Sequence, residues 1–111
     1  MSSSYNINNI YLKPSVVNNS YVAGQALTVD ATAGGVQFGT AFNDKTSFVV
    51  FDIQTADVIV TFDGQTPAAG TKGHRLYAGQ QYTWSKAAAS AAKFIRATST
   101  SGFVWASEFQ V

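Results

Sequence analysis

The sequence predicts an all-β sandwich of one domain, preceded by an extended N-terminal arm. From residue 20 onward, apolar and polar residues alternate with a period of two, and the alternating segments are separated by Gly, Asn and Asp. Several of these segments are short, as is typical of sandwiches. The length of 111 residues matches one ordinary domain. We therefore expect an arm at residues 1–19 and a single β-sandwich domain at 20–111.

The arm is rich in Asn and Ser and carries apolar residues at irregular spacing. Ordering one backbone residue costs about 1 to 2 kcal/mol, whereas burying a large apolar side chain stabilises by about 1.5 to 3 kcal/mol. These few side chains cannot order the arm alone, so we expect it to become ordered on the strand edge of a partner. A terminus without a role and an arm that packs on its own sheet are the alternatives. The residues expected to bind a partner are Tyr5, Ile7, Ile10 and Tyr11.

Eight strands are expected in the domain. In chain order they are residues 21–29, 36–42, 47–54, 57–62, 74–78, 80–85, 93–99 and 103–110. Residues 48–51 are apolar at every position, which indicates a central strand covered on both sides. Residues 86–92 are mostly Ala and predict a short helical turn between two strands.

The last expected strand shows the clearest alternation. Its odd positions include Phe103, Trp105 and Phe109, and its even positions hold smaller or polar residues. Large aromatic side chains contribute strongly to cores, so we expect the aromatic face of this strand to be buried. Tyr82 and Trp84 share one parity within their own strand and are also expected to point inward.

The composition excludes several classes of function. Seven basic and six acidic residues give a formal charge of +1, which is too small to hold nucleic acid or an anionic membrane surface. The absence of Cys excludes disulfides, thiolate zinc sites and cysteine nucleophiles. No apolar stretch approaches 18 residues, and the first residues lack the pattern of a secretory signal, so we expect a soluble protein.

Neutral polar residues replace ions on the expected surface. Charged residues make up 12% of the chain, about half of the usual share of roughly 25%. Asn, Gln, Ser and Thr together number 35. Such groups cost less to desolvate than ions, so this surface favours contact with other molecules.

No pattern predicts catalysis or a bound cofactor. His74 is the single histidine and lies in a turn-to-strand segment, with no nucleophile elbow in the chain. Residues 64–73 have the wrong spacing for a phosphate-binding loop, and we interpret them as a glycine-rich connection. Most of the carboxylates lie near turns, where Asp bonds to local amides, so neither a glycosidase pair nor a metal site is indicated.

Aromatic residues leave one binding function open. Trp84, Trp105, Tyr77 and Tyr82 could together form a platform for a sugar. Stacking of single-stranded bases is less favoured, because that function also needs a cationic groove.

A series of short motifs runs through the second half of the chain. They are Val58-Ile59-Val60-Thr61-Phe62-Asp63-Gly64, Pro67, Gly70, Gly73-His74-Arg75-Leu76, Ala78-Gly79-Gln80 and Lys93-Phe94-Ile95-Arg96-Ala97. Over residues 45–111 this pattern resembles small virion proteins of tailed bacteriophages. The size of the chain and its arm also resemble the capsid-decorating staple or cement proteins of epsilon-fifteen-like short-tailed phages.

The resemblance implies a jelly-roll-like sandwich that forms a homodimer on the outer surface of an icosahedral capsid. Its partners would be the major capsid protein and a second copy of the chain, and it would be made in the host cytoplasm. The resemblance implies no enzymatic activity, metal or cofactor. A carbohydrate-binding sandwich and a phage neck or tail connector protein are the alternatives.

Overall fold

The computed structural model describes residues 20–111. Within this range the chain forms seven strands and one short helix. Their bounds are β2 Ser20–Val29, β3 Phe48–Gln54, β4 Val58–Thr61, β5 His74–Leu76, β6 Gln81–Ser85, α2 Lys86–Ala91, β7 Lys93–Arg96 and β8 Gly102–Gln110. Seven of the eight expected strands are confirmed to within a few residues, and the expected helical turn is present as α2.

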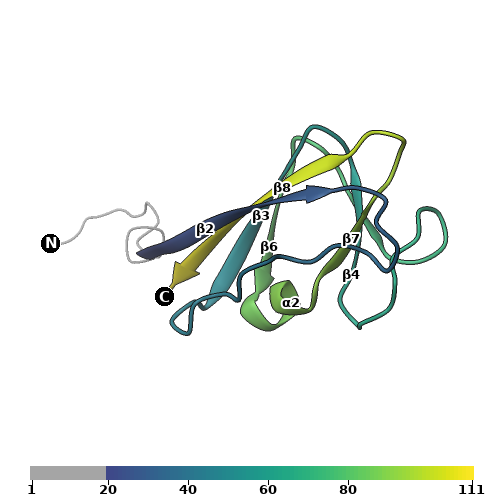
Figure 1. The fold of residues 1–111 in the computed structure, drawn as a ribbon. Coiled ribbons are helices and arrows are strands. Elements are labelled where there is room, and N and C mark those ends of the chain that lie inside the picture. The colour runs from purple at the N-terminus through teal and green to yellow at the C-terminus, as the bar shows by residue number, and fades with distance from the viewer. Residues whose placement is uncertain (1–19) are drawn as a thin grey trace, which may run out of the picture.

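The strands form two antiparallel sheets, which confirms the all-β prediction. One sheet has four strands in the order β2-β8-β3-β6, and the other has three in the order β5-β4-β7. The chain passes from one sheet to the other between β3 and β4, between β5 and β6, through α2, and again before β8. Strands β2 and β8, at the two ends of the described range, pair along almost their whole length, so the ends of residues 20–111 lie together (Figure 1). The jelly-roll connectivity stays a prediction.

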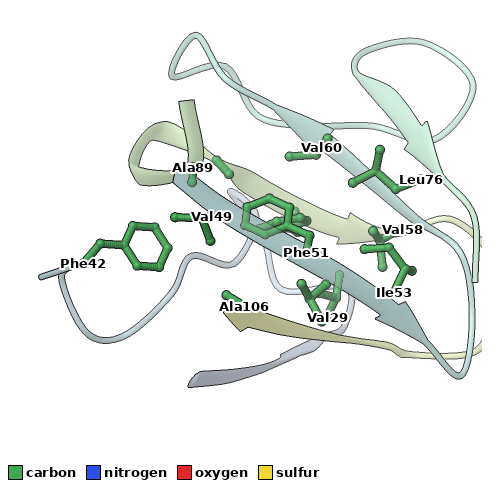
Figure 2. Packing of buried hydrophobic residues seen from close by; sticks show 13 residues of the cluster. Val29, Phe42, Val49, Phe51, Ile53, Val58, Val60, Leu76, Ala89 and Ala106 are labelled. Carbon is green, nitrogen blue, oxygen red and sulfur yellow. The ribbon is translucent and has the colours of Figure 1, made fainter. Parts of the chain in front are cut away.

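The hydrophobic core lies between the two sheets, as Figure 2 shows. Phe51 of β3 is fully buried, and its ring centroid lies 5.5 Å from that of Phe94 of β7. Phe38, from the connection before β3, packs on both rings at 5.5 and 5.7 Å. Aromatic rings from three separate segments therefore fill the centre of the space between the sheets.

The short helix α2 connects the two sheets and closes one end of the core (Figure 1). Ser85 caps its first turn, because its Oγ accepts a hydrogen bond from the Ala88 N–H at 3.1 Å. Ala89 and Ala92 are buried, and their small side chains allow the backbone to lie close to the core. Among the described residues, no helix is long and apolar enough to cross a lipid bilayer.

The strand expected at 36–42 is wrong. This segment makes a single β-bridge, between Val36 and Phe94, and is otherwise irregular. Just before this segment, Gly34 and Gly35 both have φ of 86°, outside the strand region, and they turn the chain there. The apolar residues of the segment still reach the core, but as side chains of a loop.

The buried face of β8 is the opposite of the one expected from its aromatic residues. Val104 and Ala106 are fully buried, whereas Trp105 is 36% exposed. The physical reason is the volume available between the sheets. Phe51 lies beside Ala106 on the inner face of the same sheet, and its ring packs on that of Phe94 from the other sheet, so the small side chains of β8 fit next to these rings and large ones would not.

The central strand β3 lies between β8 and β6 but is covered on one side only. Val49 and Phe51 are fully buried in the core, whereas Phe48 and Val50 point to the other side and are half-buried. The expectation that residues 48–51 are covered on both sides is therefore wrong. Their continuous apolar character instead places apolar side chains on the outside of the sheet.

Candidate functional site

The candidate site is the face of the four-stranded sheet that points away from the three-stranded sheet, here called the outer face. Strand register assigns its residues. They are Gly24, Ala26 and Thr28 of β2, Phe103, Trp105, Ser107 and Phe109 of β8, Phe48, Val50, Asp52 and Gln54 of β3, and Gln81, Thr83 and Ser85 of β6, with Tyr21 opposite Phe109. Aromatic and neutral polar side chains dominate this set. Aromatic residues are enriched and charged residues are depleted at the centres of protein interfaces, so this composition makes the outer face a candidate interaction surface.

An aromatic cluster occupies one end of the outer face, beside residue 20. Phe48 and Phe109 stack with their ring centroids 5.2 Å apart and an interplanar angle of 12°. Tyr21 meets Phe109 edge to face at 5.7 Å and is 57% exposed. Val111 follows β8 at the same end and is also exposed. Tyr21, Phe48 and Phe109 are called the aromatic cluster below.

Trp105 lies further along the same face and covers Gly24 of the neighbouring strand. A Cβ atom built on Gly24 would lie 2.5 Å from Cζ2 and 3.0 Å from Cε2 of the Trp105 indole, and it would also meet the Tyr21 hydroxyl. The indole therefore rests directly on the backbone of β2. This support holds the ring in place while 36% of the residue remains exposed.

One carboxylate lies beside Trp105 on the outer face. Asp52 of β3 is the register partner of Trp105, and directly opposed residues have Cβ atoms about 4.5 to 5.5 Å apart. The Asp52 Oδ2 accepts a hydrogen bond from Gln54 Nε2 at 3.1 Å. Among the residues that strand register assigns to the outer face, Asp52 is the one with a charged side chain.

The four aromatic residues considered as a sugar platform do not share one surface. Tyr82 and Trp84 point inward, as expected, and pack against the core. Trp84 lies 4.6 Å from Phe62, measured between ring centroids. Tyr77 is exposed outside the outer face, with the Arg75 guanidinium 5.6 Å from its ring. Only Trp105 of the four lies on the outer face.

The region around His74 has structural contacts rather than a reactive arrangement. His74 is exposed and lies 6.2 Å from Phe62 between ring centroids. Within residues 20–111, no group of three His, Cys, Asp or Glu side chains is placed to hold a metal ion. In the glycine-rich connection, Ala68 and Lys72 form a β-bridge, and Lys72 Nζ donates to Gln65 Oε1. Lys93 Nζ also donates to the Gly64 carbonyl oxygen at 3.1 Å, so this connection is an ordered turn held by its own residues and by β7.

Asp57 joins the start of β4 to the residues after β5. Its Oδ1 accepts a hydrogen bond from the Ala78 N–H at 2.8 Å, and its Oδ2 accepts from Nε and Nη2 of Arg75 at 3.0 and 2.8 Å. The Ala78 bond and then the Arg75 bonds hold the pKa of Asp57 below its usual value. Both oxygens of the Asp57 carboxylate accept hydrogen bonds from residues of or after β5, so this ion pair has a structural role.

A pocket of about 370 Å³ lies between the irregular segment at 36–42 and α2. Its lining includes Phe38, Phe42 and Lys86. Lys86 is the one residue of the lining with an ionisable side chain.

The residues expected to bind a partner, Tyr5, Ile7, Ile10 and Tyr11, lie outside the described residues. The sequence pattern did not predict that the outer face carries aromatic side chains, because large aromatic residues of β8 are expected in the core. The apolar character of both faces of residues 48–51 was the signal that could have found it.

Comparison with protein families, with curated proteins and with solved structures finds no match. The fold is that of an all-β protein, and the outer face of its four-stranded sheet carries aromatic side chains, of which Tyr21 and Trp105 are the most exposed.

Proposed function

We propose that the chain is a non-enzymatic virion structural protein that decorates an icosahedral phage capsid. In this proposal it lies on the outer capsid surface and stabilises the shell by bridging neighbouring major capsid subunits. The observation that carries the proposal is the aromatic cluster beside residue 20. It supports a contact surface beside Ser20, the residue that follows the arm in the chain, and the sequence assigns the apolar residues of that arm to partner binding.

The aromatic cluster has the composition of an interface centre. Tyr and Phe are enriched at protein interfaces, and charged residues are depleted from their centres. Burying Tyr21 and Val111 against another protein would remove exposed apolar surface from water, which favours association. Lys and Arg are absent from the residues assigned to the outer face. The affinity of a capsid contact made through the outer face would therefore change little between low and high salt, unlike that of an ion-paired contact.

Firm attachment in this proposal comes from repetition. Each copy contacts the capsid weakly through its arm and its aromatic cluster. A twofold dimer links the contact sites of two copies. Linked weak contacts bind much more tightly than single ones, because the second contact forms within the same complex. The two packed sheets form a rigid body between these contact sites.

The first test is quantification of the chain in purified particles, alongside the major capsid protein. Decoration predicts hundreds of copies on the outer surface. A neck or tail connector protein, the alternative with the same fold, predicts about a dozen copies or fewer, because connectors form closed rings. Absence from particles would refute both.

The second test compares two exposed tyrosines. Tyr21→Ser changes the aromatic cluster, and Tyr77→Ser changes an equally exposed tyrosine elsewhere on the domain. Retention on capsids after heating should fall for Tyr21→Ser and for deletion of residues 1–12, and should remain normal for Tyr77→Ser. Thermal unfolding of each variant shows that the domain is still folded. Unchanged retention of both Tyr21→Ser and the deletion would refute this mode of attachment.

A further inference from the structure

We propose that the free edge of β2 pairs with the same edge of a second copy of the chain. The two strands would run antiparallel about a twofold axis, with Ala26 opposite Ala26 of the second copy, and would join the two four-stranded sheets into one. This inference names the interface of the twofold dimer in the capsid proposal and rests on that proposal for its biological role. Its physical basis is the edge itself, which can be tested in solution without capsids.

β2 differs from the other three edge strands of the two sheets. Val36 covers the edge of β7, because it exchanges two backbone hydrogen bonds with Phe94 at 2.8 and 2.9 Å. β5 has three residues, which include His74 and Arg75, and β6 has five residues and leads directly into α2. β2 has ten residues, none of them charged and none of them Pro. Short length, charges and Pro commonly protect an exposed edge against pairing, and β2 lacks all three.

The hydrogen bonds of β8 show which backbone groups of β2 are free. In an antiparallel sheet, successive residues of a strand direct their N–H and C=O groups alternately to the two neighbouring strands. The Phe109 carbonyl oxygen accepts a hydrogen bond from the Ser47 N–H at 2.7 Å, on the side of β3. The even residues of β8, among them Ala106, therefore direct these groups to β2.

Three residues of β2 direct their backbone groups away from the domain. Gln25 lies opposite one of the even residues of β8, so Gly24, Ala26 and Thr28 point their N–H and C=O groups to the free edge. Within residues 20–111, the backbone hydrogen bonds of β2 go to β8 alone. The connection before β3 reaches β2 through the Gln25 side chain, whose amide exchanges hydrogen bonds with the Thr40 backbone. The edge groups are therefore open to a further strand.

One register uses all three residues. With the axis at Ala26, Gly24 lies opposite Thr28 of the second copy, and Thr28 lies opposite Gly24 of that copy. Each opposed pair exchanges two backbone hydrogen bonds, which gives about six in all. The register shift between Tyr21 and Ala23 lies outside this pairing. Moving the axis to either neighbouring residue would place one of the three opposite a residue outside the regular part of β2. A typical interface has about 10 ± 5 direct hydrogen bonds, so this edge alone supplies a substantial share.

The composition of β2 favours a second copy over a charged partner strand. Twofold pairing brings a strand against its own sequence, and like charges directly opposite each other are destabilising. β2 has no charged residue, so pairing with itself meets no such repulsion, and an acidic or basic strand would find no complementary charge. Ala26 and Thr28 are exposed and small, so they leave room for the second copy.

Pairing would also cover part of Trp105. Its indole lies over Gly24, where a Cβ atom would be 2.5 Å from Cζ2. In the proposed register Gly24 is opposite Thr28 of the second copy, and directly opposed residues have Cβ atoms about 4.5 to 5.5 Å apart. Thr28 of the second copy would therefore contact the indole and bury part of the 36% of Trp105 that is exposed. The indole N–H signal of Trp105 thus reports on the dimer.

The test measures the mass of the full-length chain by sedimentation equilibrium, from about 1 µM to about 0.5 mM. We expect a monomer–dimer equilibrium in which the Trp105 indole N–H signal moves as the dimer forms. Ala26→Lys and Ala26→Glu each place like charges across the axis, so each should weaken dimerisation about tenfold or more. An equal mixture of the two variants should recover a heterodimer, detected by native mass spectrometry, because opposite charges then face each other.

Thr83→Lys is the matched control. It adds the same charge to an exposed outer-face residue of β6, at the other edge of the same sheet, and should dimerise like the parent. A parent chain that remains a monomer at about 0.5 mM would overturn the interface. Equal dimerisation of Ala26→Lys and Thr83→Lys, or a mixture that forms no heterodimer, would also overturn it. If deletion of residues 1–12 abolishes the dimer and Ala26→Lys does not, the arm forms the contact and pairing through β2 is wrong.

The dimer interface and attachment to capsids can fail separately. If the chain dimerises as described but is absent from particles, the β2 interface stands and the capsid proposal fails. If particles carry hundreds of copies, and Ala26→Lys attaches and dimerises like the parent, the capsid proposal stands and the β2 interface is wrong.

Discussion

Glu108 on β8 holds Thr46, a residue 62 positions earlier in the chain. The Thr46 hydroxyl donates a hydrogen bond to Glu108 Oε1 at 2.8 Å, and the Asn43 N–H donates to the same oxygen at 2.7 Å. Glu108 and Thr46 are both buried. This carboxylate therefore attaches the connection before β3 to the last strand, from the inner side of the sheet.

Glu108→Ala should destabilise the domain by about 2 to 3 kcal/mol, because two donors would remain buried without an acceptor. Glu108→Gln keeps an oxygen at this position and should cost about 1 kcal/mol. Urea unfolding measures both values. Equal losses for the two variants would show that the two hydrogen bonds do not stabilise this connection.

Gly24→Ala should destabilise the domain by about 1 to 3 kcal/mol, because the new methyl group collides with the Trp105 indole and the Tyr21 hydroxyl. The variant should also move the Trp105 indole N–H signal. Gly39→Ala is the matched control, since nothing lies within 4 Å of a Cβ at that position. Its stability should remain within about 0.5 kcal/mol of the parent. Similar losses for the two glycines would contradict the placement of the indole on Gly24.

Asp57→Asn should reduce the loss of stability in acid. The pKa of Asp57 is lowered in the folded state, first by the Ala78 N–H and then by Arg75. Such a group contributes stability above its unfolded pKa, near 3.9, and this contribution is lost as the pH falls through the lowered folded pKa. Unfolding measured between about pH 5 and pH 2 should therefore show a smaller decline for Asp57→Asn than for the parent.

Arg75→Gln is the control for this pH dependence. It keeps the bond from the Ala78 N–H, the larger cause of the lowered pKa, so it should retain most of the acid-dependent loss. If Arg75→Gln and Asp57→Asn flatten the profile equally, the ion pair dominates and the order of causes is wrong.

Phe51→Ala and Trp105→Ala test which side of the four-stranded sheet is the core. Phe51 is fully buried, so its removal should cost about 3 to 5 kcal/mol. Trp105 is larger but partly exposed on the outer face, and its removal should cost less than half as much. Thermal or urea unfolding of the two variants provides the comparison. A greater loss for Trp105→Ala would indicate that the aromatic face of β8 is buried.

The positions of the strands were predictable because they depend on local properties of the chain. Alternation of apolar and polar residues marks each strand, and turn residues separate them. Gly64 and Gly79, for example, both adopt positive φ between strands. The short helix was equally predictable, since Ser85 and the alanines after it supply a cap and high helical propensity. The pattern also predicts a strand at 36–42, but this segment is a loop, and its apolar side chains reach the core from there.

The orientation of the sheet faces could not be predicted in the same way. Alternation in β8 separates Val104 from Trp105, but it does not say which of the two meets the other sheet. That choice follows from the volume left by Phe51 and Phe94, which belong to segments distant in the chain. Local pattern was therefore sufficient for the class of fold, the strands and the unusually neutral surface. The candidate site depends on packing between segments that are distant in the chain. Phe51 and Phe94 fill the core, and Trp105 and its neighbours therefore lie on the outer face.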